Sequence, residues 1–125
     1  MAAPKRALFL IRTAMITGVL AFAVAVIVTR RQGAVTAATD RAASLRMMAQ
    51  VAALIAGIAV MAMRTRLSAV APSRDSTMRI VAWACGEFAA IFGLVAVLLT
   101  GADAAAAPGL TVFALSLVLF PLPRD

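Results

Sequence analysis

Four apolar stretches, separated by short polar segments, make up most of the chain. They cover residues 7–29, 43–63, 79–100 and 108–122. An α-helix needs roughly 20 apolar residues to cross a bilayer, a length that the first three stretches reach and the fourth reaches only marginally. The pattern predicts an all-α fold, a four-helix transmembrane bundle with short loops that forms one integral membrane domain over residues 1–125.

Composition excludes an ordinary water-soluble domain. Of the 125 residues, 64% are hydrophobic and 14% are charged, whereas soluble domains are about half apolar and a quarter charged. The lipid bilayer is therefore the first partner that we expect. The first stretch begins after Lys5 and Arg6, as a signal peptide does, but it exceeds the usual apolar core of about 7–15 residues and ends in Arg30 and Arg31. We interpret it as a retained transmembrane helix.

The positive charges follow the pattern of a membrane topology signal. The net charge is +7, but the basic residues bracket apolar stretches and do not alternate with aromatic residues, so we expect no nucleic acid partner. With four spans, the side of the amino terminus holds Lys5, Arg6, Arg64, Arg66, Arg74, Arg79 and Arg124. The opposite side holds Arg30, Arg31, Arg41 and Arg46. The positive-inside rule then places the amino terminus in the cytoplasm, with the chain in the inner or cytoplasmic membrane.

Few residues in this sequence could carry chemistry. It contains no His and a single Cys, which excludes His-ligated haem, chlorophyll and zinc, as well as His-dependent nucleophilic catalysis. Cys85 lies within the third stretch and is interpreted as a small packing residue. We therefore expect no enzyme activity, no metal site and no cofactor, and leave a bound lipid open.

Within the third stretch, Glu87 is the one charged residue between Ile80 and Leu99. It lies about eight residues beyond Arg79, roughly 12 Å along a helix and close to the middle of the hydrocarbon layer. Arg12 lies at a depth in the first stretch that differs by only about 5 Å. If these two helices are neighbours, Arg12 and Glu87 can form a charged interhelical clamp, and loss of one partner would cost about 3–5 kcal/mol.

Two other interpretations of these side chains stay open. Arg12 can extend its guanidinium to the headgroups and leave Glu87 alone. A carboxyl group alone in lipid is neutral and can exchange a proton or bind a cation. We favour the clamp.

Two series of small residues predict close contacts between helices. Ala49, Ala53 and Gly57 recur every four residues in the second stretch. In the third stretch, a stripe of small residues runs beside the helix face that carries Glu87, and it consists of Ala82, Gly86, Ala90 and Gly93. Small side chains at such spacings let two membrane helices approach closely.

The polar segment before the third stretch contains signals for a helix start. Pro72 and Asp75 mark a turn, and Ser76 follows them. Ser is a favoured N-cap residue, so Ser76 is expected to cap the helix that carries Glu87.

Residues 87–99 resemble a known carrier helix. The run Glu-Phe-Ala-Ala-Ile-Phe-Gly-Leu-Val, followed by Leu98 and Leu99, is similar to the ion-carrying helix of the proteolipid, subunit c, of rotary ATP synthases. Phe92 stands where that family usually has Tyr. The resemblance implies that Glu87 is an ion-binding carboxylate, and it is confined to this one helix.

Two functions follow as hypotheses. The first is a small non-catalytic accessory subunit that packs against other transmembrane subunits of a larger complex, of an energy-transducing kind (respiratory, photosynthetic or ATPase-type). The alternative is a proteolipid or small transporter that handles protons or cations through Glu87. Self-association into a homo-oligomer is left open.

Overall fold

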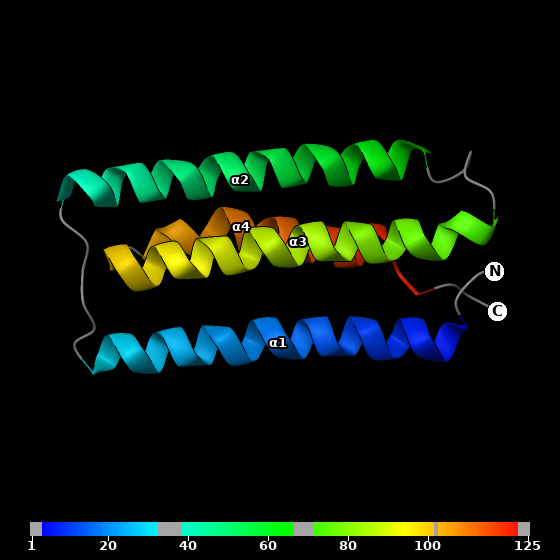
Figure 1. Cartoon of the computed structure of the whole chain (residues 1–125), viewed down its shortest axis with the longest axis horizontal. Helices are drawn as coiled ribbons and strands as arrows, with labels where there is room; N and C mark the ends of the chain where they lie inside the picture. The colour runs from blue at the N-terminus through cyan, green and yellow to red at the C-terminus, as the bar shows by residue number, and fades with distance from the viewer. Residues whose placement is uncertain (1–3, 33–38, 67–71, 102, 123–125) are drawn as a thin grey trace.

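Every described element of the chain is helical. The computed structural model describes residues 4–32, 39–66, 72–101 and 103–122. Its elements are α1 (Lys5–Arg31), α2 (Thr39–Arg66), α3 (Pro72–Thr100), the short 3₁₀ helix η2 (Asp103–Ala106) and α4 (Ala107–Leu119). The four α-helices run along one common axis (Figure 1). The prediction of an all-α four-helix fold is confirmed.

Helix α3 is the centre of the bundle. It packs against α1, α2 and α4, while α1 and α2 lie on opposite sides of it (Figure 1). Half of its apolar span is buried, compared with 11% for α1 and 22% for α2. The outer helices therefore keep most of their apolar surface directed away from the protein.

Helix α4 is much shorter than the other three helices. Helices α1, α2 and α3 are long and apolar enough to cross a membrane. At 1.5 Å per residue, the 13 residues of α4 extend only about 20 Å, which is less than the hydrocarbon thickness of about 30 Å. The sequence predicted this marginal fourth helix, but it ends at Leu119, before the predicted limit at residue 122.

The start of α3 differs from the prediction. The helix begins at Pro72, and Ser76 lies buried inside it. The predicted N-cap at Ser76 is therefore wrong. Proline is well suited to the first turn of a helix, where its missing N–H has no intrahelical partner to lose.

The helices alternate in direction, which groups their ends. At one end, α1 and α3 begin and α2 and α4 end; we call this the amino-terminal end (Figure 1). At the other, the far end, α1 and α3 finish and η2 leads into α4. Lys5, Arg6, Arg64 and Arg66 thus share the amino-terminal end, whereas Arg30 and Arg31 lie at the far end.

Candidate functional site

The carboxyl end of α4 needs hydrogen-bond donors from other helices. Phe120 leaves the helix with φ −120° and ψ 68°, outside the α region that a following proline disfavours. Pro121 has no N–H, so the carbonyl of Leu117, four residues earlier, has no intrahelical donor. In hydrocarbon, where water is absent, an unpaired carbonyl costs several kcal/mol, on the order of 2–7.

Three side chains from α1 and α3 donate hydrogen bonds to carbonyl groups at this end of α4. Arg12 Nη2 donates to the Leu117 oxygen at 3.0 Å. Trp83 Nε1 donates to the Phe120 oxygen at 2.9 Å in a buried bond, and Arg79 Nη1 donates to the Pro121 oxygen. We call Arg12, Arg79 and Trp83 the α4 cap.

Further contacts orient the guanidinium groups of Arg12 and Arg79. The Arg12 guanidinium carbon lies 5.8 Å from the centre of the Trp83 ring, within the range of a cation–π interaction. Arg79 Nε donates to Asp75 Oδ2 at 2.8 Å, one helical turn away. Two cations at a helix carboxyl terminus also oppose its negative dipole end. The α4 cap therefore ties the carboxyl end of α4 to α1 and α3.

The predicted partners Arg12 and Glu87 contact different groups. Their helices are neighbours, as a clamp requires, but Arg12 is bonded to Leu117. Glu87 is half-buried and faces α1, where its Oε1 lies 3.7 Å from the position that a Cβ on Gly18 would take. Within the described residues, Glu87 forms no ion pair or hydrogen bond, with Arg12 or with any other group.

The small-residue stripe of α3 lies against η2 and α4. A Cβ on Gly86 would lie 3.0 Å from the Phe113 Cα, and one on Gly93 would lie 3.2 Å from the Ala105 oxygen. Ala82 and Ala90 are fully buried. The stripe thus allows the backbones of α3 and α4 to approach closely.

The small residues of α2 also face the protein. Ala49 and Ala53 are buried. A Cβ on Gly57 would meet a Val112 methyl group of α4 at 3.5 Å, an ordinary contact distance. This face of α2 is therefore less tightly packed than the α3–α4 contact.

Several residues of the site were not predicted from the sequence. Arg79 and Trp83 were not predicted as donors, and Gly109 of α4 was not recognised as the point where α4 meets the α3 backbone at Ala89. Pro121 near the end of the fourth stretch was the available signal, because a proline there removes a donor from α4.

The long apolar helices and the internally capped α4 define a helical integral membrane protein. Among the described residues, no group of three or more His, Cys, Asp or Glu side chains could hold a metal ion. The chain matches no protein-family model, no curated protein and no solved structure.

Proposed function

We propose that this protein is a small non-catalytic accessory subunit whose helix α1 docks against a transmembrane helix of a larger complex. The proposal is supported by the exposure of α1, in which only Leu8, Val19 and Val26 are buried. Among the other helices, α1 packs chiefly on α3. The rest of its apolar surface is open to lipid or to a partner helix.

The exposed side of α1 carries its own series of small residues. Ala14, Gly18, Ala21 and Ala25 are all exposed, and their spacing of four, three and four residues places them on one helix face. We call them the α1 small-residue face. A second helix can approach such a face closely, which favours a protein neighbour over disordered lipid chains.

Glu87 offers a polar group at the edge of the same docking face. Its carboxyl group lies beside Gly18 at the seam between α1 and α3. A partner helix on the α1 small-residue face can therefore bring a hydroxyl or amide side chain within reach of Glu87. Such polar contacts contribute about 0.6–2 kcal/mol to membrane helix association.

The membrane and the type of complex are further parts of the proposal. The larger number of Lys and Arg residues at the amino-terminal end favours a cytoplasmic location for that end, in an inner or cytoplasmic membrane. The resemblance of the helix around Glu87 to an ion-carrying helix favours an energy-transducing assembly.

Substitution of Ala21 by tryptophan is expected to remove the partner. An indole on the α1 small-residue face prevents close approach, so Ala21→Trp should reduce co-purification of foreign subunits in mild detergent at least about tenfold, the equivalent of 1.4 kcal/mol. Leu20→Trp is the matched control, because Leu20 is 61% exposed on another face of α1. Equal recovery of partners with both variants, or no partner with the wild-type protein, contradicts the proposal.

Proton or cation handling through Glu87 is the second candidate function. The observation that favours it is the absence of a charged partner on Glu87 among the described residues, together with its place inside the apolar part of α3. An ionisable side chain inside a membrane helix is a candidate site for a proton or a cation.

A hydrophobic carbodiimide tests this second candidate, since it reacts with protonated carboxyl groups in membranes. Glu87 is expected to be labelled at neutral pH, and mass spectrometry of the digested protein would locate the adduct. Asp103, with its side chain 84% exposed, is the internal control that should stay unmodified. Labelling that persists in Glu87→Gln, or that is absent from Glu87 at every pH, rules the candidate out.

A further inference from the structure

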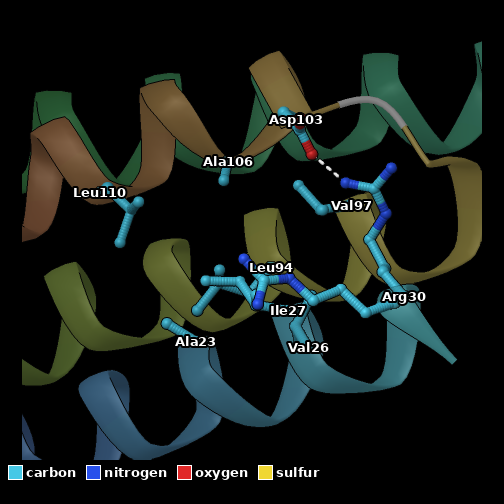
Figure 2. Close-up of a pocket in the computed structure, with 10 residues that line it drawn as sticks. Ala23, Val26, Ile27, Arg30, Leu94, Val97, Asp103, Ala106 and Leu110 are labelled. Atoms are coloured by element: carbon cyan, nitrogen blue, oxygen red, sulfur yellow. Dashed lines mark hydrogen bonds and ion pairs between the residues drawn. The ribbon is translucent and has the colours of Figure 1, made fainter.

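A groove opens at the far end of the bundle between α1, α3 and the η2–α4 segment. It encloses about 520 Å³, a size within the range of ligand sites. Its walls are apolar and include Ala23 and Ile27 of α1, Leu94 and Val97 of α3, and Leu110 of α4 (Figure 2). The elements on its two sides therefore leave a strip of apolar surface uncovered.

Charged residues line the groove only where α1 ends. Arg30 and Arg31 are the last residues of α1, and Asp103 begins η2. Arg30 donates to Asp103, as the dashed line in Figure 2 shows. With two arginines and one aspartate, this end of the groove carries a net positive charge. In the part of the chain that the structure describes, Arg31 makes no ion pair.

The position of the arginines defines the depth of the groove in the membrane. Basic residues that close an apolar helix lie at the level of the lipid headgroups. The apolar walls then extend from that level into the hydrocarbon layer. The groove thus presents a cationic group to a headgroup and an apolar surface to an acyl chain.

We propose that this groove binds an anionic phospholipid, with its phosphate at Arg31 and Arg30 and one acyl chain along Ile27 and Leu94. Charge complementarity selects the headgroup, because arginine guanidinium groups form charge-assisted hydrogen bonds with phosphate oxygens. Asp103 weakens the site, since its carboxylate occupies Arg30 and repels the phosphate. The lipid also fills the gap between α1 and α4, two helices that otherwise meet little.

The test is lipid binding to the full-length protein in detergent, measured by native mass spectrometry. Phosphatidylglycerol and phosphatidylcholine with identical acyl chains are the two probes. We expect phosphatidylglycerol to bind about fivefold more tightly, since one basic residue contributes about 1 kcal/mol. Arg31→Gln should abolish that preference, whereas Arg46→Gln, an exposed arginine on α2 outside the groove, should preserve it. Asp103→Asn should increase the preference, because it frees Arg30.

A second pair of variants tests the apolar walls. Ile27→Trp fills the groove and should weaken the binding of both lipids at least about fivefold. Val24→Trp is the control, since Val24 is also exposed on α1 but does not line the groove. Thermal denaturation without added lipid verifies that each variant is folded.

Three results would overturn the proposal. The first is equal affinity for the two lipids in the wild-type protein. The second is equal weakening by Ile27→Trp and Val24→Trp. The third is competition by glycerol phosphate as strong as that by the intact lipid, which would reveal a site for a free anion.

Discussion

Replacement of Gly109 by alanine is expected to lower the free energy of unfolding by about 3 kcal/mol, the upper part of the range for overpacked cores. A Cβ at this position would lie 2.7 Å from the Ala89 carbonyl carbon and 3.1 Å from the Ala90 nitrogen. Both atoms belong to the backbone of the central helix α3. The steric clash can therefore be relieved only if the whole of α4 moves. Unfolding by SDS in mixed micelles would measure the change.

Gly57→Ala is the matched control for this prediction. The added methyl group meets only the Val112 side chain at 3.5 Å, and alanine favours a helix by about 0.8–1 kcal/mol relative to glycine. Gly57→Ala should therefore be neutral or slightly stabilising. Equal stability of the two variants would show that α3 and α4 are not in close backbone contact at Gly109.

Replacement of Arg12 by leucine is expected to cost about 1.5–3 kcal/mol, the range for a hydrogen bond that involves a charged group. The loss arises because the Leu117 carbonyl has no other donor among the described residues, given that Pro121 lacks an N–H. Arg12→Lys should recover part of the loss, since an ammonium group also donates to a carbonyl. Arg6→Leu, at an exposed position on the same helix, should have little effect.

The free energies of unfolding of Glu87 variants distinguish a role of Arg12 in the α4 cap from a charged clamp between Arg12 and Glu87. If Arg12 acts through Leu117, Arg12→Leu and Glu87→Leu should be additive to within about 0.5 kcal/mol, as for independent sites. A charged clamp predicts a coupling energy of several kcal/mol, because removal of one member of a buried pair costs about 3–5 kcal/mol. Strong coupling would therefore contradict the arrangement in which Arg12 and Glu87 have separate environments.

Glu87 shows where sequence reasoning was sufficient and where it was not. Counting residues along each helix predicts similar depths for Arg12 and Glu87. In the structure, Glu87 lies beside Gly18, which is six residues and about 9 Å further along α1 than Arg12. The axial offset between two helices and the rotation of each helix about its axis together decide which side chains meet. Arg12 turns toward Trp83 and the end of α4, while Glu87 faces Gly18.

The close contact between α3 and α4 could not be predicted from the sequence and is seen only in the tertiary structure. The spacing of Gly86 and Gly93 predicts that a helix approaches, and it does not specify which one. Gly109 is a single glycine within α4 and belongs to no repeat. Its role emerges only when the backbone at Ala89 is placed against it.

By itself, the sequence determined that this is an all-α membrane protein with three long helices and a shorter fourth, because the length and apolarity of a segment suffice to predict a span. Only the tertiary structure decided that α3 is central, that Arg12, Arg79 and Trp83 close the end of α4, and that α1 keeps an open face. These features depend on pairings between helices. Nearly every side chain in the membrane is apolar, so hydropathy carries little information about which helices pair.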